Sequence, residues 1–413
     1  MRASSANPGN ATEWMRGVTL RTGTFSSGIV FVTAPAQPRS KARAIISTVF
    51  VGGAEARMNG FLSVTPRNST CRVGIVSWLP RAALSRGRAV RWRARRAGRP
   101  PPPAPRWPLR ERDRRTNLTL QLTGDPRRWP SEPGAPGVIR VLDPEPYHYS
   151  FGRTDEEKTA QNLLYLEEIL AYENPQSIAA MIIETVTGTN GVLPPPAGYL
   201  QGLKALLQKH GILLICDEVM AGMGRTGRMM AYEHGGIVPD IVTMAKGLTS
   251  SYFPLGAMGV SDAIAAHFRK NVFWGGLTYN SHPLGLATAE AVIRVMLDEK
   301  MIENAARLEG VMRAEMARLQ AKHPSMAAGR CIGLFGMIDV RKNARNEPLA
   351  PYNGSHPAMV RLGKFFGEEG LFTFVHWGSF TCVPPLCITE EQLRDGFAII
   401  DRGLEITDAV YEG

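Results

Sequence analysis

Three short apolar runs, each followed by a polar residue, constrain the fold of this chain more than any other feature. The runs cover residues 178–183, 212–216 and 241–244, and the polar residues that follow them are Glu184, Asp217 and Lys246. Amphipathic helices are predicted around them, at 155–172, 198–210, 263–270, 284–298 and 301–322. Strands that alternate with helices are typical of an α/β fold with a largely parallel sheet. Since ligands bind beyond the carboxyl ends of parallel strands, we expect the three side chains to meet in one crevice.

The C-terminal part shows a different pattern. Residues 331–340 are predicted to form one strand of a smaller α+β domain. Thr389 and Gln392 form a capping box that opens a last helix, predicted to run to about Val410. We therefore predict three segments: an atypical segment (1–120), a large ligand-binding domain (121–298) and a small C-terminal domain (299–413).

Charge separates the first segment from the rest. Residues 1–120 contain 22 Lys+Arg and 4 Asp+Glu, whereas the remaining residues contain 26 and 33. All but one of those 22 are Arg, and the Pro run at 100–103 opposes both helix and strand. One interpretation is a disordered basic arm that binds phosphates. The other is a stretch read from a shifted frame, because GC-rich DNA in a wrong frame gives this bias. The remainder is mildly acidic and offers no electrostatic ground for binding nucleic acid.

The cysteines and the hydropathy of the chain indicate in which cellular compartment it is expected. The five cysteines are scattered, without a CxxC pair or the spacing of metal ligands. We therefore expect free thiols, no metal site and a cytoplasmic location. No apolar run approaches the roughly 18–20 residues that span a bilayer, and the pattern of a secretory signal is not seen at the N-terminus. We expect no membrane partner.

Residues 215–251 carry the most specific motif. The sequence "ICDEVMAGMGRTGRMMAYEHGGIVPDIVTMAKGLTSS" places Asp-Glu-Val after a strand, then a Gly-rich turn, and Ala-Lys-Gly after the next strand. Asp217 and Lys246 stand 29 residues apart. This motif resembles the signature of class III (omega) aminotransferases, and the resemblance extends over about residues 120–413. It is most similar to the taurine–pyruvate aminotransferases and their omega-amino-acid relatives. It implies fold type I and pyridoxal 5'-phosphate (PLP) as cofactor.

The resemblance also implies roles for individual residues. Lys246 would carry PLP covalently and transfer the substrate proton, and Asp217 would keep the ring nitrogen protonated. Val219 would pack against the ring. Thr278 matches a threonine that reaches the cofactor phosphate across a dimer interface, which implies a homodimer. From their positions alone, however, the lysine and the carboxylates fit a structural salt-bridge cluster equally well.

Other positions match the family less completely. "FVGGAEA" (50–56) resembles the start of the phosphate loop, in which Gly53 and Ala54 would present backbone N–H groups. The aromatic-His-Gly that the family places over the ring is missing from the first segment. Glu184 resembles the family glutamate near the substrate entrance. His376 stands where the family commonly has an arginine for the substrate carboxylate, and a histidine does not make that bidentate fork.

The function predicted from the sequence is a PLP-dependent aminotransferase. It would move an amino group from a terminal amine, such as taurine, β-alanine or 4-aminobutyrate, to a 2-oxo acid such as pyruvate. One alternative is a catalytically impaired PLP-binding relative whose N-terminal half is incomplete. Another is a different PLP reaction on the same scaffold, such as that of an aminomutase or a decarboxylase. Arg225, in "GMGRTG", is interpreted as a structural brace of the Gly-rich turn.

Overall fold

The structure is a computed structural model that describes residues 117–132, 137–146 and 149–413. It also describes the backbone of four strands before them: β1 (Thr19–Leu20), β2 (Phe31–Thr33), β3 (Ile45–Val51) and β4 (Gly74–Ser77). The predicted phosphate-loop residues Gly53 and Ala54 lie outside the described residues. No helix in the described part of the chain is long and apolar enough to cross a membrane.

A nine-stranded sheet organises the first part of the molecule, in the order β1-β2-β3-β9-β8-β7-β6-β4-β5. Its remaining strands are β5 (Val138–Arg140), β6 (Ile178–Glu184), β7 (Leu213–Asp217), β8 (Ile241–Met244) and β9 (Leu255–Val260). Pairing is parallel between β6 and β7 and between β7 and β8, and antiparallel elsewhere. The α/β fold class is therefore confirmed, with a mixed sheet in which parallel pairing is confined to the three strands that the apolar runs predicted.

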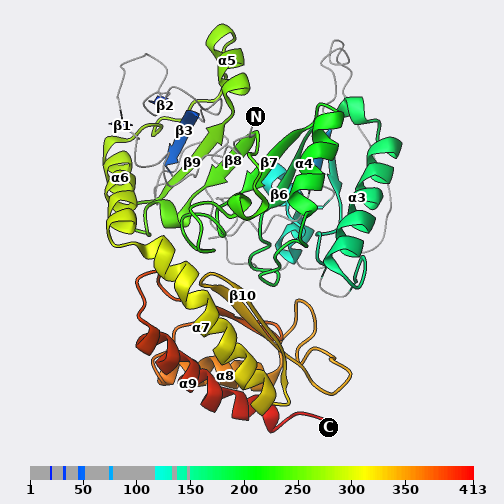
Figure 1. The fold of residues 1–413 in the computed structure, drawn as a ribbon, viewed down its shortest axis with the longest axis vertical. Helices are drawn as coiled ribbons and strands as arrows, with labels where there is room; N and C mark the ends of the chain where they lie inside the picture. Colours follow the sequence, from blue (N-terminus) through cyan, green and yellow to red (C-terminus); the bar gives the residue numbers. More distant parts are fainter. Residues whose placement is uncertain are drawn as a thin grey trace, which may run out of the picture.

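Helices cover this sheet in two groups (Figure 1). α3 (Asp155–Tyr172) and α4 (Tyr199–Lys209) bury their leucines against β6 and β7 in one apolar core. α6 (Pro283–Asp298) packs with β8 and β9 in a second core, and α5 (Asp262–Lys270) follows β9 directly. The short helical segments are α2 (Asn117–Leu122), η3 (Pro126–Ser131), η4 (Pro175–Ser177), η5 (Ala231–Gly235) and η6 (Lys246–Leu248).

A four-stranded antiparallel sheet and three helices form the C-terminal part, which lies below the large sheet in Figure 1. The strand order is β10-β11-β13-β12, with β10 (Met326–Ile332), β11 (Phe335–Val340), β12 (Val375–His376) and β13 (Ser379–Cys382). The helices α7 (Met301–Lys322), α8 (Pro357–Glu368) and α9 (Glu390–Asp408) share one core with it. The prediction of one strand over 331–340 is wrong: a turn at Gly333, with φ +56°, divides this stretch into β10 and β11.

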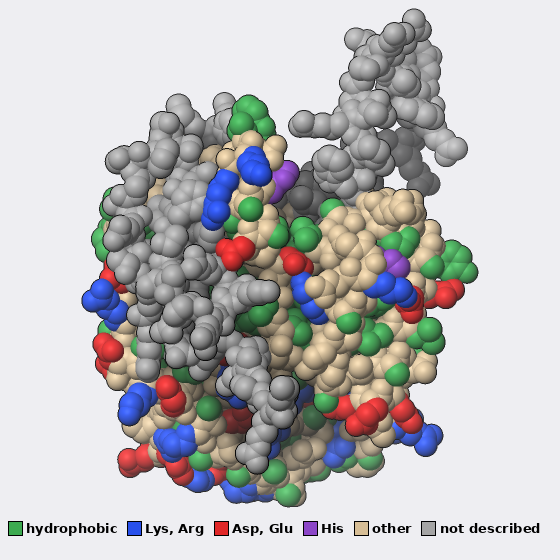
Figure 2. Space-filling model, turned by 45° about the horizontal axis from the view of Figure 1, so that its top comes forward, with side chains coloured by type: hydrophobic (Ala, Val, Ile, Leu, Met, Phe, Trp, Pro, Cys, Tyr) green, Lys and Arg blue, Asp and Glu red, His purple; other side chains and the backbone are tan. Residues whose placement is uncertain are grey.

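The surface of the described residues carries charges of both signs. Figure 2 shows Lys and Arg side chains intermixed with Asp and Glu on one face of the molecule. Elsewhere in the described residues, oppositely charged side chains form ion pairs one helical turn apart, such as Arg294–Glu290 and Arg313–Glu309. Interspersed charges stabilise exposed helix faces by a few tenths of a kcal/mol per pair. On this face they create no field of a single sign.

Candidate active site

Glu184 and Asp217 stand side by side at the carboxyl edge of the parallel strands. They are register partners at the ends of β6 and β7, and Asp217 also pairs with Thr243 on β8. Register partners on parallel strands point to the same face of a sheet. Both side chains are buried, with 5% of their surface exposed. The sheet therefore brings together two carboxylates that are 33 residues apart in sequence.

Lys246 lies at the same edge, two residues beyond the end of β8. It opens η6 and has φ +47°, in the left-handed region that residues other than glycine rarely adopt. Such conformations cost of order 1–3 kcal/mol and cluster at functional sites. The Lys246 charge acts on the pKa of Glu184, and so does the Asp217 charge. Lys246 and Asp217 therefore both lie near enough to Glu184 for their charges to act on its carboxyl group.

The surroundings of the Glu184 carboxyl group disfavour its charged form. Burial raises its pKa well above the ordinary value, and the neighbouring Asp217 and Asp143 charges raise it further. The Gly188 N–H and the Lys246 charge oppose this shift without overcoming it. Oε2 accepts the Gly188 N–H at 2.7 Å, while Oε1 is buried and has no hydrogen-bond partner among the described residues. Since buried polar atoms are almost always paired, Oε1 is suited to a bound molecule.

These residues fit one end of a PLP molecule. A buried carboxylate such as Asp217 is the partner that a protonated pyridine nitrogen needs, and Lys246 supplies the amine for covalent attachment. The buried, unpaired Oε1 of Glu184 marks a polar position in the same surroundings. The fit covers the ring nitrogen and the attachment point of PLP. It does not extend to the phosphate, because Gly53 and Ala54, which were predicted to bind it, lie outside the described residues.

Val219 and Thr278 occupy different surroundings. Val219 is buried, and its N–H donates to Oδ1 of Asp217 at 2.9 Å, which fixes the orientation of that carboxylate. Thr278 is exposed in the turn before α6. An exposed hydroxyl there is open to a second subunit, as the resemblance implies. The structure describes one chain, so the roles of both residues stay predictions.

His376 lies in the C-terminal part, on the edge strand β12. Its ring stacks between Phe374 and Trp377, with centroids 5.0 Å and 3.9 Å away. Trp377 in turn contacts Tyr352, with centroids 4.3 Å apart. An aromatic stack replaces the guanidinium expected at this position. A substrate contact of His376 stays a prediction.

The Gly-rich turn at 222–227 joins the two parts of the molecule. A side chain on Gly227 or Gly333 would overlap its neighbour, because the two turns and α7 approach within backbone contact. Arg225 donates to the carbonyl oxygens of Leu334 at 3.0 Å and of Pro384 at 2.6 Å. Burial lowers its pKa to about 10, so Arg225 remains charged at neutral pH. The contacts agree with its interpretation as a brace.

Sequence reasoning missed three residues of this region. Asp143 lies shortly beyond β5, as Lys246 lies beyond β8, so the same rule about polar residues after strands identifies it. Glu218, next to Asp217, is fully buried and accepts three hydrogen bonds. Arg330 reaches the loop after Glu184 from β10. Only Asp143 had a signal in the sequence, because the other two act through contacts between distant segments.

Comparison with known proteins identifies the family. The model of the aminotransferase class-III family matches residues 114–404. The chain belongs to the class-III aminotransferase family. The resemblance seen in the sequence is therefore confirmed, and with it PLP as the cofactor of the family to which the chain belongs.

Individual relatives extend the comparison. The taurine–pyruvate aminotransferase of Bilophila wadsworthia is 32% identical over 295 residues, covering 68% of this chain and 63% of that protein. Gamma aminobutyrate transaminase 1 of Solanum lycopersicum is 33% identical over 308 residues, covering 72% and 58%. An uncharacterized aminotransferase of Sinorhizobium fredii, y4uB, is 35% identical over 273 residues, covering 63% and 57%. The chain thus spans 57–63% of the length of these curated relatives.

A solved structure shows the same fold. The taurine:2-oxoglutarate aminotransferase of Bifidobacterium kashiwanohense, in complex with PLP and glutamate, superposes with a TM-score of 0.68. It is 37% identical, and the match covers 71% of this chain and 67% of that one. The fold type I assignment is therefore confirmed.

Proposed function

We propose that this protein catalyses PLP-dependent transamination between an omega-amino compound and a 2-oxo acid. The observation that carries the proposal is the meeting of Lys246, Asp217 and Glu184 at the carboxyl edge of β6, β7 and β8. Bound PLP supplies an electron sink for breaking a C–H bond next to the amino group. What remains for the protein is to bind the substrate, hold one proton and move another.

Each of the three residues has one task. The Asp217 carboxylate accepts a hydrogen bond from the ring nitrogen and keeps the proton there, because a buried anion is stabilised by a cationic partner. Lys246 Nζ, as a neutral amine, takes the substrate proton and returns it to a neighbouring atom. The Glu184 carboxyl presents its buried Oε1 to a polar substrate group. The two carboxyl groups thus have different tasks because their surroundings differ: burial raises the pKa of Glu184.

The donor is proposed to be a terminal amine of the taurine, β-alanine or 4-aminobutyrate type, and the acceptor a 2-oxo acid such as pyruvate. The names of the relatives support this class, since they include taurine–pyruvate, gamma aminobutyrate and diaminobutyrate transaminases. Such donors carry the amino group at a distance from the acidic group. The aromatic stack at His376 is the proposed contact for the distal part of the substrate.

A homodimer is proposed as the working assembly. Large apolar side chains are exposed on either side of Thr278: Phe268, Val272, Trp274, Tyr279 and Leu284. Apolar patches of this kind mark protein–protein contacts. A second copy seated there would cover the patch and place Thr278 at the partner's cofactor phosphate. A cytoplasmic location is also proposed, supported by the free thiols of the four cysteines in the described residues.

The test traps the cofactor on the protein. The full chain is incubated with PLP, reduced with borohydride and mapped by mass spectrometry, with taurine–pyruvate transamination measured in parallel. We expect the label on Lys246, and in K246A we expect no label and a rate lower by about a thousandfold or more. K300A is the matched control, because Lys300 also has a left-handed backbone (φ +53°) but is exposed before α7.

Three outcomes decide the proposal. Label on Lys246 with alanine formed from pyruvate supports it. Label on Lys246 without amino transfer to any tested 2-oxo acid would identify an impaired relative. Label absent from Lys246, or equal in wild type and K246A, would contradict the assignment of the site.

A further inference from the structure

A tight loop follows Glu184 and determines where its carboxyl group points. Thr187 and Leu193 exchange two backbone hydrogen bonds, of 3.1 Å and 2.9 Å, that close the loop. Inside it, the Gly188 carbonyl accepts the N–H groups of Gly191 at 3.0 Å and Val192 at 2.8 Å. The N–H of the same Gly188 donates to Glu184 Oε2 at 2.7 Å. The loop therefore occupies one oxygen of Glu184, and Oε1 has no hydrogen-bond partner in the described part of the chain.

The loop holds a strained backbone. Val192 has φ +48° and is completely buried. For a β-branched residue the left-handed region is a genuine outlier, and it persists only where the surroundings enforce it. Gly191 lacks the space for a side chain, since a Cβ there would lie 3.0 Å from Leu193 and 3.2 Å from Arg330 Nη2. Of these two neighbours, Arg330 lies outside the loop and close to Gly191.

Arg330, on β10 of the C-terminal sheet, makes that contact. Its Nε donates to the Gly191 carbonyl oxygen at 2.5 Å. Asp339 on β11 grips the guanidinium with both oxygens: Oδ2 pairs with Nη1, and Oδ1 lies 3.3 Å from Nη2. Ser379 on β13 donates to Asp339 Oδ1 at 2.8 Å. A bidentate pair fixes the guanidinium plane as well as its position. Three strands thus aim Arg330 at the loop.

We propose that Arg330 is a positioning residue for Glu184. By pinning the Gly191 carbonyl, the Arg330–Asp339 pair holds the loop in its strained form and keeps the Gly188 N–H on Oε2. Glu184 Oε1 is then presented to the substrate in one orientation. The proposal rests on the proposed function for the substrate contact of Glu184, whereas the brace itself is independent of it.

Arg313 provides a matched control for a purely structural brace. It lies on α7, pairs with Glu309, and donates from Nη2 to the Cys331 carbonyl oxygen at 3.1 Å. It contacts β10 through the Cys331 carbonyl, and like Arg330 it pairs with one carboxylate, here Glu309 of its own helix. No contact links Arg313 to residues 187–193 among the interactions described for the two. Replacing Arg313 therefore shows how the enzyme responds when β10 is weakened without any change at the loop.

The experiment compares R330M, R330K and R313M in the full chain. We expect R330M to raise the KM for the amino donor by about tenfold while kcat changes by less than about threefold, because a contact made equally in ground and transition states is lost. The borohydride-trapped label on Lys246 should be unchanged. R330K, which keeps one donor, should recover part of the KM. R313M should leave the kinetics as in wild type.

Hydrogen exchange without substrate tests the brace separately. In R330M the amides of Gly188 and Val192 should exchange at least about tenfold faster than in wild type, and in R313M they should not. Equal exchange in R330M and wild type, or equal KM changes in R330M and R313M, would overturn the proposal. A wild-type protein that transfers no amino group would contradict the proposed function only. The hydrogen-exchange result would still test the brace, because it does not require activity.

Discussion

Glu218 shows how a buried acid is tolerated beside the active site. It is fully buried and accepts hydrogen bonds from Thr185 Oγ1 at 2.6 Å, the Ala231 N–H at 2.8 Å and the Tyr232 N–H at 2.9 Å. Burial raises its pKa to about 7, although these three donors lower it in part. One side chain thus joins the loop after β6 to the segment that begins η5.

Replacing this acid should change how stability depends on pH. The unfolded chain releases the Glu218 proton near pH 4.5, while the folded protein keeps it to about pH 7. The folded state binds the extra proton between these values, so this group makes stability fall as pH rises through that window, by on the order of 3 kcal/mol. In E218Q this contribution should be absent. The free energy of unfolding, measured in urea at several pH values from 4.5 to 7.5, should therefore fall less steeply with pH than in wild type.

E218Q should also be less stable than wild type at pH 5, by about 1–3 kcal/mol, since its amide group faces one of the three donors. E168Q removes an exposed glutamate on α3 and serves as the control for loss of a charge. An E218Q slope identical to that of wild type would show that Glu218 titrates in the folded protein as it does in the unfolded chain.

At the scale of single residues, the sequence predicted the parts of the site that follow a strand. Glu184, Asp217 and Lys246 were identifiable because a polar residue at the end of an apolar strand, or just beyond it, is placed by the strand itself. The orientation of Glu184 was not predictable, because it depends on a contact between residues 191 and 330. His376 was recognised as a departure, but its aromatic stack depends on Tyr352 and Trp377 as well.

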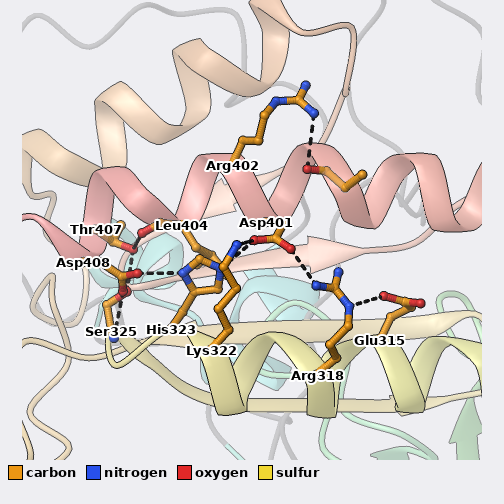
Figure 3. A network of polar contacts seen from close by, with 11 residues as sticks. Glu315, Arg318, Lys322, His323, Ser325, Asp401, Arg402, Leu404, Thr407 and Asp408 are labelled. Carbon is orange, nitrogen blue, oxygen red and sulfur yellow. Dashed lines mark hydrogen bonds and ion pairs between the residues drawn. The ribbon is translucent and has the colours of Figure 1, made fainter.

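At the scale of elements, α7 and α9 are joined by a buried histidine (Figure 3). His323, the residue that caps the end of α7, directs Nδ1 to Asp408 at 2.6 Å and Nε2 to Asp401 at 2.9 Å. The buried ring therefore bridges two carboxyl groups of α9. Arg318 and Lys322 on α7 also pair with Asp401.

Loss of His323 should weaken the C-terminal part strongly. H323Q removes a buried ring that contacts Asp401 and Asp408 at once, so we expect the unfolding free energy to fall by about 3 kcal/mol. R318Q removes an exposed partner of the same Asp401 and should cost less than about 1 kcal/mol. Urea unfolding of the two variants at pH 7 makes the comparison. Equal losses would mean that the histidine adds nothing beyond a surface ion pair.

The loss in H323Q should shrink in acid. Burial raises the pKa of Asp401, but hydrogen bonds from Arg318, Lys322 and His323 outweigh burial and lower it well below its usual range. A lowered pKa gives stability that is present above the unfolded value, near pH 3.8, and is lost as pH falls further. The difference between wild type and H323Q should therefore narrow below about pH 4.

Helices were easier to predict than the strands of the C-terminal part. The predicted bounds of α3, β8 and α7 agree with the structure, since each has an apolar face and clear ends. The capping box of Thr389 and Gln392 is present at the start of α9. The division of 331–340 was missed because Gly333 lies inside an apolar run, and its turn is set by contact with the Gly-rich turn at 226–227.

At the scale of the whole molecule, the order of the strands in the large sheet could not be predicted from the sequence. The three parallel strands were predicted from their apolar runs, but β9 returns antiparallel and carries β3 beside it. Neighbours such as these are chosen by packing between distant segments. The same holds for the junction of the two sheets, which depends on Arg225 and on two glycines that approach within backbone contact.

The exposed apolar surface around Thr278 leads to the last prediction, which concerns assembly. Trp274 is 91% exposed and Leu284 59% exposed, and such side chains are costly to leave in water. The full chain should therefore sediment as a dimer at micromolar concentration.

W274E/L284E places charges in the proposed interface and should shift the chain to monomer. Its PLP affinity should fall by about tenfold, because Thr278 no longer reaches the partner's phosphate. Y172E changes an equally exposed aromatic at the end of α3 and should remain dimeric, with unchanged affinity. A W274E/L284E protein that stays dimeric would place the interface elsewhere, whereas a monomer with full PLP affinity would show that each subunit binds its cofactor alone.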